Sequence, residues 1–268
     1  MRTWNLFHGN TNPPGRVAFL ERMVRLAVED GPDVVCLQEV PVWALERLHE
    51  WSGMSVFPAV TEPPRIGPFR WTAGLGRRLT AINPGLFRSS FQGQANAVLA
   101  APALAPVDAG TIVLNPASFR KAQARRLALG LVPKLAWASD RRICQAVRVT
   151  LADGRTALIA NLHATAYSPD RRLAEVELLR AATFADGLAT HGDAVVLAGD
   201  FNLSTRSTRV LHELAGPDWG FSAAGPGIDH VLARSLSVAE GPAAWPDRRR
   251  RHDGRLLSDH APVDARLE

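Results

Sequence analysis

Cysteine is scarce in this 268-residue sequence, and long apolar runs are missing altogether. Its two cysteines, Cys36 and Cys144, are too few for a disulfide framework and fit no zinc-binding spacing. Both lie in apolar runs, so we expect buried free thiols in a reducing, cytoplasmic compartment. No apolar run approaches the ~18 residues that a membrane-spanning helix requires, and the first residues contain no apolar signal segment.

Acidic residues are also in the minority, since 26 Asp and Glu stand against 31 Lys and Arg, which gives a net charge of +5. Basic proteins of this size often bind polyanions. Residues 111–149 carry eight basic side chains against Asp140 alone, around the apolar segment LALGLVPKLAW, and Arg248–Arg251 form a second basic run. Such stretches fit nucleic-acid phosphates, an anionic membrane or a solvated loop, and the sequence does not choose between them.

Apolar patterns typical of strands alternate with helical ones along the whole chain. A helix is predicted after Thr11 or Asn12 and ends at Gly31-Pro32, and a long one is predicted over 169–189 behind Ser168. Strands are predicted over residues 33–39, 97–104, 142–151, 156–164, 194–201, 228–233 and 261–268. Because no linker divides the chain, we expect one α/β domain over 1–268, with sheet packed on sheet and helices outside.

Polar side chains follow the predicted strands at the points where they end. These residues are Asn5, Gln38-Glu39, Asn161 and His163, Asp200 and Asn202, and Asp259-His260. A single Asp or Asn at a strand end indicates only a turn. Five such endings predict that the strands converge on one polar site, and Asp200 and Asn202 should share a face because alternate strand residues do.

The motifs LQE, NLH, GDFN, IDHV and SDHAPV occur in this order between Asn5 and the C-terminus. In order and spacing they resemble the endonuclease/exonuclease/phosphatase superfamily, which includes deoxyribonuclease I, sphingomyelinases and inositol polyphosphate 5-phosphatases. The resemblance covers nearly the whole chain. It implies a four-layer α/β sandwich, in which two mixed β-sheets pack face to face with helices outside.

A divalent metal site is expected from the carboxylate and amide oxygens, because hard oxygen ligands suit Mg²⁺. Glu39 is the best candidate ligand, with Asn5 beside it, and the family resemblance implies that both positions bind metal. Asp259 is expected on the metal side. The expected ion is Mg²⁺, with Mn²⁺ as a substitute.

The resemblance also implies roles for the remaining polar residues. Asp200 would take the proton from the attacking water or orient it, and Asn202 would hold that water or a phosphate oxygen. His260 would contact the phosphate or transfer a proton, with Asp229 as its carboxylate partner. Hydrolysis of a phosphodiester needs such groups around the phosphoryl oxygens.

The stretch around His163 resembles deoxyribonuclease I and the sphingomyelinases, where a second histidine is the general acid. The run DRRICQAVRV resembles their arginine-bearing strand, which makes Arg142 a candidate phosphate contact, although it could instead pair with Asp140. The sequence departs from that pattern in one respect, because no acidic partner for His163 is found. Gln94 or Asn96 stands there instead, and we assign Asn96 to substrate binding.

Together these features predict a divalent-metal-dependent phosphodiester hydrolase, and the most favoured kind is a nuclease-like phosphodiesterase acting on nucleic acid. The alternatives are a phospholipid phosphodiesterase of the sphingomyelinase kind, with membrane lipid as its substrate, and a phosphatase of inositol or other phosphate esters. A catalytically dead nucleic-acid-binding module is disfavoured, because Glu39, Asp200 and His260 are all present. No obligate protein partner is expected.

Overall fold

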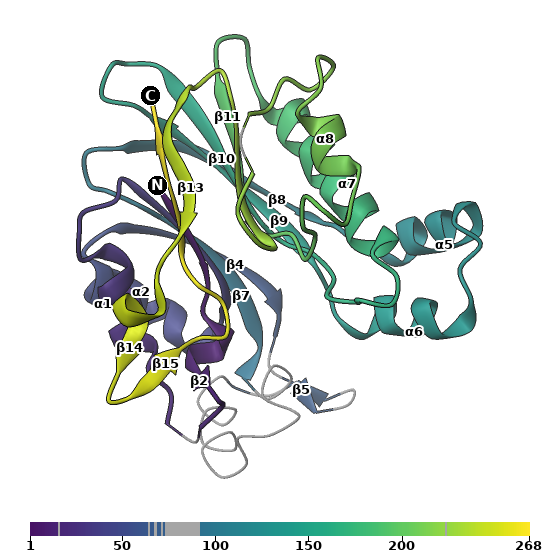
Figure 1. The fold of residues 1–268 in the computed structure, drawn as a ribbon, viewed down its shortest axis with the longest axis horizontal. Coiled ribbons are helices and arrows are strands. Elements are labelled where there is room, and N and C mark those ends of the chain that lie inside the picture. Colours follow the sequence, from purple (N-terminus) through teal and green to yellow (C-terminus); the bar gives the residue numbers. More distant parts are fainter. Residues whose placement is uncertain (16, 64, 67–68, 71, 73–91, 223) are drawn as a thin grey trace. The chain divides into compact units, whose positions relative to one another are not determined.

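The computed structural model describes all residues except 16, 64, 67–68, 71, 73–91 and 223. The chain divides into two compact units (Figure 1). The first comprises Met1–Leu104 and Ala244–Asp264, and the second comprises Ala105–Ala243 and Ala265–Glu268. Both combine sheet and helix, which confirms the predicted α/β class. The face-to-face packing of the sheets and the single domain over 1–268 stay predictions.

The first sheet has the strand order β13-β16-β1-β3-β7-β4. It is mixed, because β1 runs parallel to β3 while β16 is antiparallel to β1 and β7 is antiparallel to both β3 and β4. Its strands are β1 (Arg2–Asn5), β3 (Val34–Val40), β4 (Ser55–Glu62), β7 (Gln94–Ala100), β13 (Val238–Ala244) and β16 (Val263–Leu267).

The elements of the first unit that lie outside this sheet are short. The helices are η1 (Phe7–Gly9), α1 (Leu20–Val28), η2 (Val42–Arg47), α2 (Leu48–Ser52) and η3 (Asp247–Arg250). The small strands are β2 (Thr11–Asn12), β5 (Arg65–Ile66), β6 (Phe69–Arg70), β14 (Arg251–His252) and β15 (Arg255–Leu257).

Alternation along the central strands separates an apolar face of the first sheet from a polar one. Trp4, Leu37 and Leu99 pack into one core cluster with Met23 and Val24 of α1. Residues one step along each strand have the opposite orientation. On β1, β3 and β7 these include buried polar residues: Thr3, Asn5, Gln38, Gln94 and Asn96.

The second unit contains the five-stranded sheet β12-β11-β10-β9-β8, in which only β10 and β11 run parallel. Its strands are β8 (Ala105–Val113), β9 (Ile143–Thr150), β10 (Thr156–His163), β11 (Ala194–Asp200) and β12 (Asp229–Arg234). Its helices are α5 (Ala117–Arg126), α6 (Leu131–Ser139), α7 (Arg172–Leu188) and α8 (Val210–Leu214).

Helix α7 covers one face of this second sheet (Figure 1). Leu158 and Leu162 of β10 and Leu197 of β11 share a core cluster with Leu178 and Ala182 of α7. The opposite face again carries buried polar residues, which are Gln145, Asn161, His163 and Asp200. Each sheet therefore turns its polar side chains away from its helices.

Two predicted helix starts are wrong. Thr11 and Asn12 form strand β2, which pairs with β15, and the first helix begins only at Leu20. The backbone of Thr11 pairs with Leu257 in the antiparallel β2–β15 pair. The Thr11 hydroxyl donates to the Pro13 carbonyl at 2.8 Å, so Thr11 cannot cap a helix. Helix α7 begins at Arg172 rather than beside Pro169.

Both cysteines are buried free thiols, as predicted. Burial raises the pKa of Cys36 to about 12, so this thiol is an inert core residue. Among the described residues, no helix has the length and apolar character needed to cross a membrane.

Candidate active site

Glu39 in β3 is presented by an irregular backbone. The pairing of β3 with β7 shifts between Leu37 and Val40, and Glu39 has a φ of 52°. A positive φ is uncommon for a residue with a side chain, and a β-bulge re-aims the side chain it carries. The Glu39 side chain keeps 20% of its surface exposed, so its carboxylate is accessible to a ligand.

Two side chains fix this carboxylate. Asn5, at the end of the adjacent strand β1, donates from Nδ2 to Glu39 Oε1 at 3.3 Å, and its Oδ1 accepts from the Phe7 N–H. His8 Nε2 lies 3.3 Å from Glu39 Oε2. His8 is buried at a φ of 52° within η1. His8 is not among the candidate site residues named from the sequence, because no periodic pattern marks it.

Asp259 and His260 are held beside the same strand end. The Ser258 hydroxyl donates to the Asn5 carbonyl at 2.7 Å and accepts from the His260 N–H, while Trp4 Nε1 donates to the His260 carbonyl. Burial raises the pKa of Asp259, and the nearby negative charge of Glu39 raises it further. Two carboxylates that repel each other are both stabilised in their charged form when a cation binds between them.

Within the run Arg248–Arg251, Arg249 and Arg250 are engaged in contacts within the protein, whereas Arg248 and Arg251 are exposed. Arg250 is buried and donates from Nη1 to the carbonyls of Leu257, Ser258 and His260. Arg249 pairs with Asp30 at 2.8 Å and lies 3.4 Å over the Trp245 ring. Arg250 therefore holds the loop that carries Asp259, a structural role that was not among the alternatives left open by the sequence.

Replacing Arg250 with alanine should lower the free energy of unfolding by about 2–4 kcal/mol, because the buried hydrogen bonds to the carbonyls of Leu257 and Ser258 are lost. Urea denaturation followed by circular dichroism measures this change. Arg248→Ala is the matched control, since Arg248 is exposed in the same helix and should change stability by less than about 0.5 kcal/mol. Equal stability of the two variants would contradict the structural role of Arg250.

In the second unit, the parallel strands β10 and β11 deliver His163 and Asp200 to the same edge of the sheet. The two residues are direct partners in the strand register. Gly199, just before Asp200, has a φ of 141°, and a Cβ atom there would lie 1.9 Å from the Leu162 carbonyl oxygen. The glycine of GDFN is therefore required by the close approach of β10.

His163, Asp200 and Arg142 form a buried cluster at this edge. His163 Nε2 lies 3.5 Å from Asp200 Oδ2, so the acidic neighbour that the sequence did not reveal is Asp200. Arg142 Nη1 lies 2.9 Å from His163 Nε2, and its Nη2 pairs with Asp140 at 3.2 Å. A guanidinium only donates, which makes Arg142 suited to phosphate oxygens.

Asn202 does not continue the strand alternation, because β11 ends at Asp200. Its N–H donates to Asp200 Oδ1 at 3.0 Å in an Asx turn, its φ is 52°, and its Nδ2 donates to the Ala164 carbonyl. Asp229 begins β12 directly opposite Asp200. Like charges at opposed strand positions repel, so this edge also favours a cationic group.

Two buried residues that sequence reasoning missed support this edge. His230 Nε2 contacts the Leu203 carbonyl at 2.6 Å while its Nδ1 accepts from the Gly225 N–H, and burial lowers the pKa of His230. Glu177 of α7 accepts hydrogen bonds from Trp137 Nε1 and from the N–H and hydroxyl of Thr165. Burial raises the pKa of Glu177. Glu177 thus anchors the chain just beyond His163.

Glu177→Gln should lower the free energy of unfolding by about 1–3 kcal/mol, because an amide N–H₂ then faces donors that need an acceptor. Chemical denaturation of the variant measures the loss. Glu213→Gln, at an exposed position in α8, is the control and should stay within about 0.5 kcal/mol. If Glu177→Gln matched this control, the anchoring role would be wrong.

The donor set of the first unit fits a hard divalent cation. Glu39 and Asp259 supply carboxylate oxygens, which is the chemistry Mg²⁺ prefers, whereas the Asn5 amide oxygen accepts from the Phe7 N–H in this structure. Asn96 on β7 is fully buried, and neither its Oδ1 nor its Nδ2 has a hydrogen-bond partner within the described part of the chain. An orphaned buried amide costs free energy unless water or a ligand satisfies it.

The structure therefore gathers the predicted residues into two sets. Asn5, Glu39, Asp259 and His260 lie together in the first unit. The second unit holds Arg142, His163, Asp200, Asn202 and Asp229 at one sheet edge. That all of them line one cleft stays a prediction.

Comparison with known proteins bears on the family and the fold of the chain. The profile of the Endonuclease/Exonuclease/phosphatase family matches residues 3–260, whereas a comparison with curated proteins finds no match. An endonuclease/exonuclease/phosphatase from Bacteroides vulgatus has a similar structure, with a TM-score of 0.69 and 15% identity over 100% of this chain and 97% of that one.

Two further solved structures are similar to the whole chain. The mannosyl-6-phosphatase Bt3783 of Bacteroides thetaiotaomicron VPI-5482 has a TM-score of 0.64 and 16% identity, covering 100% of this chain and 98% of that one. D. rerio TDP2, complexed with a single-strand DNA product, has a TM-score of 0.62 and 14% identity over 100% and 97%. At these identities the likeness shows the fold, and the sequence profile shows the family: the chain belongs to the endonuclease/exonuclease/phosphatase family, whose members hydrolyse phosphoester bonds.

Proposed function

We propose that the two sets of residues form one active site, in a single catalytic domain, and that the protein is a divalent-metal-dependent phosphodiester hydrolase of the nuclease-like kind. The observation that carries the proposal is the buried cluster of Arg142, His163 and Asp200. It places a fixed cation beside a histidine and a carboxylate, which are the groups that bind a phosphate and move protons.

Proton transfer would be divided among the strand-end residues. Asp200 would take the proton of the attacking water, and Asn202, held in its Asx turn, would orient that water. His163 would give a proton to the leaving oxygen, while His260, with Asp229 as its partner, would contact the phosphate. Arg142 and Asn96 would bind phosphate or substrate oxygens.

Glu39, Asn5 and Asp259 would hold the metal ion, which we take to be Mg²⁺ with Mn²⁺ as a substitute. When bound, a divalent cation neutralises charge that develops on the phosphoryl oxygens. The protein itself fixes the orientation of the Glu39 carboxylate, through the bulge in β3 and the hydrogen bond from Asn5.

The similar structures support two substrate classes. TDP2 was captured with a DNA product, which favours a nucleic-acid phosphodiester, whereas the name of Bt3783 specifies a phosphate monoester. Nucleic acid is preferred here because the chain carries a net charge of +5 and the guanidinium of Arg142 lies at the site.

A panel of substrates with and without Mg²⁺ tests the proposal. Plasmid DNA, single-stranded RNA and bis-p-nitrophenyl phosphate should be hydrolysed in the presence of metal, and sphingomyelin and inositol phosphates should be poor substrates. Turnover of p-nitrophenyl phosphate alone would favour a phosphatase instead. Turnover of sphingomyelin alone would favour the lipid phosphodiesterase, and inactivity on every substrate would overturn the hydrolase assignment.

A further inference from the structure

Helix α6 turns large aliphatic side chains toward solvent. Leu131, Val132 and Leu135 are 71%, 67% and 62% exposed. A surface helix normally buries such residues, but α6 buries Trp137 instead, whose indole reaches Glu177. Three neighbouring exposed aliphatic residues of this size on a short helix indicate a contact surface.

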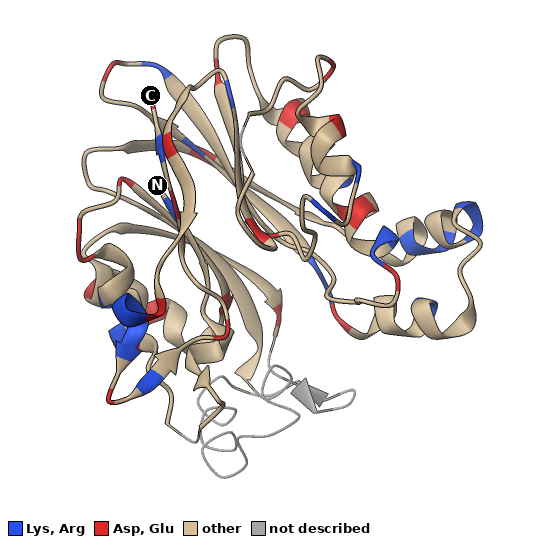
Figure 2. Ribbon diagram, in the orientation of Figure 1, with Lys and Arg blue, Asp and Glu red and all other residues tan. Residues whose placement is uncertain are grey.

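Positive charge surrounds these aliphatic residues. Residues 117–139 contain no acidic side chain and five basic ones, Arg120, Lys121, Arg125, Arg126 and Lys134. Figure 2 shows the basic residues along α5. A hollow of about 350 Å³ between α5 and α6 is lined by four of them together with Ala124 and Trp137.

The cationic hollow and the aliphatic residues are continuous. With 3.6 residues per turn, Lys134 lies between Trp137 and Leu131 around the axis of α6. Trp137 and Lys134 line the hollow on its α6 side. Leu131 and Leu135 lie on the adjoining, exposed face of the same helix. An anion in the hollow would therefore lie directly beside an apolar surface.

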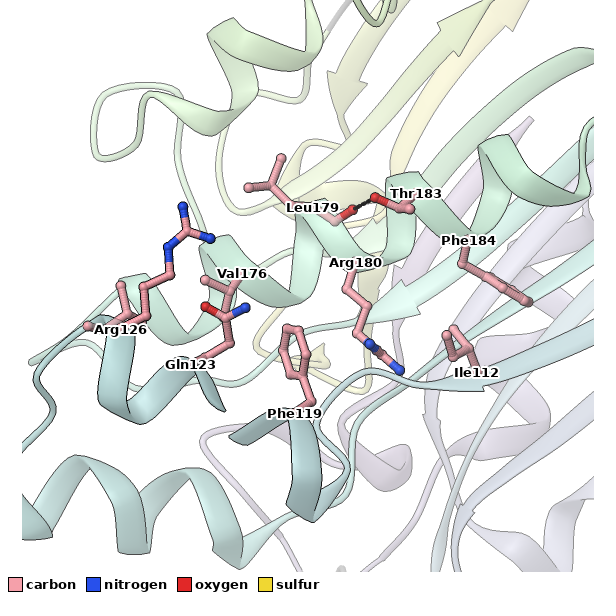
Figure 3. A pocket seen from close by; sticks show the side chains of 10 residues that line it. Ile112, Phe119, Gln123, Arg126, Val176, Leu179, Arg180, Thr183 and Phe184 are labelled. Atoms are coloured by element: carbon pink, nitrogen blue, oxygen red, sulfur yellow. Dashed lines mark hydrogen bonds between the residues drawn. The ribbon is translucent and has the colours of Figure 1, made fainter. Parts of the chain in front are cut away.

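The groove on the other side of α5 differs in character. It measures about 450 Å³ and lies between α5 and α7, and two of its ten lining residues, Arg126 and Arg180, are basic (Figure 3). Arg180 is already engaged there, because its guanidinium lies 4.6 Å over Phe119 and its Nε donates to the Val113 carbonyl. Of the two hollows, the one that faces α6 has the larger share of basic residues in its lining, with four of six.

We propose that the α5–α6 surface, comprising Lys121, Arg125, Leu131, Val132, Lys134 and Leu135, docks onto an anionic phospholipid bilayer. The three aliphatic side chains would enter the interface between headgroups and acyl chains, and the cations would bind lipid phosphates. Nucleic acid also attracts cations, but its backbone offers no apolar layer for exposed aliphatic residues. The combination therefore favours lipid over a polynucleotide.

Cosedimentation with large unilamellar vesicles tests the docking. The intact protein should pellet with phosphatidylcholine:phosphatidylserine 70:30 vesicles at 100 mM NaCl and stay in the supernatant with pure phosphatidylcholine. The Lys121→Gln/Arg125→Gln/Lys134→Gln variant should bind about a hundredfold more weakly, since each basic residue near the surface contributes about fivefold.

The Leu131→Ser/Leu135→Ser variant isolates the apolar contribution and should bind at least tenfold more weakly. Both leucines are exposed, so its melting temperature should equal that of the parent protein. Val107→Ser and Arg209→Gln are controls, because both residues are exposed in the same unit but outside this surface. Neither control should change vesicle binding.

Two outcomes would overturn the inference. One is failure of the parent protein to bind the anionic vesicles, while the charge variant alone loses affinity for a fluorescent oligonucleotide; that result would assign the surface to nucleic acid. The other is a dimer that the double leucine variant dissociates without any vesicle binding, which would assign it to a second copy of the chain. Neither outcome affects the hydrolase proposal, because the variants lie outside the active-site residues.

Discussion

Replacing Asp200 with asparagine is expected to lower kcat on bis-p-nitrophenyl phosphate by about a thousandfold, within the range that general acid–base catalysis contributes. Asparagine keeps the size of the side chain and can still accept the hydrogen bond from the Asn202 N–H. It cannot take a proton from water at neutral pH. The loss should therefore appear in kcat, with little change in the melting temperature.

The matched control for this variant is Asp186→Asn. Asp186 belongs to the same unit and pairs with Arg234, but it is 54% exposed and lies on the outer helix α7. Its replacement should leave kcat within twofold of the parent value. If Asp200→Asn also retained more than a tenth of the parent kcat, Asp200 could not be the base.

The strand-end pattern succeeded at positions governed by simple alternation. Asn161, His163 and Asp200 all lie on β10 or β11, and the apolar runs before them set both the strand and its register. The sequence predicted that both residues belong to one polar site, but it did not identify Asp200 as the acidic neighbour of His163, which the parallel pairing of β10 with β11 establishes. The family resemblance extended the prediction to the remaining residues, and the sequence profile confirms the family.

The pattern does not give the backbone conformation where the chain leaves regular structure. Glu39, Asn202 and His8 all have a φ of 52°, and periodicity does not encode that conformation. Asn202 follows the end of β11 and binds back to Asp200, so it is placed by a local turn and not by strand alternation. Residues in such uncommon conformations are often found at functional sites, which fits their position here.

The sequence also did not predict which arginines of the basic run are buried. Arg248–Arg251 read as one charged run, yet Arg250 is buried and Arg249 stacks on Trp245. Burial of an arginine depends on acceptors that are distant along the chain or fixed only by folding, here the carbonyls of the Leu257–His260 loop. A run of like charges therefore predicts a solvated surface unless such acceptors are known.

Removal of divalent metal is expected to abolish activity and to lower stability. Excess EDTA should reduce turnover at least a hundredfold, and Mg²⁺ or Mn²⁺ should restore it. Binding to the folded state should also stabilise the protein, by about 2.7 kcal/mol when the metal concentration is a hundred times Kd. The melting temperature measured with and without Mn²⁺ gives this second readout without any substrate.

Glu39→Gln should separate the metal site from the rest of the fold. The amide keeps the size of the side chain but removes the charge that, with Asp259, favours a cation. The metal concentration for half-maximal activity should rise at least tenfold, and the Mn²⁺-dependent increase in melting temperature should disappear. Glu50→Gln is the control. Glu50 is 59% exposed in the same unit, and its carboxylate forms an ion pair with the exposed Arg47. Full turnover of the parent protein in excess chelator, or an unchanged metal response of Glu39→Gln, would exclude Glu39 as the metal ligand.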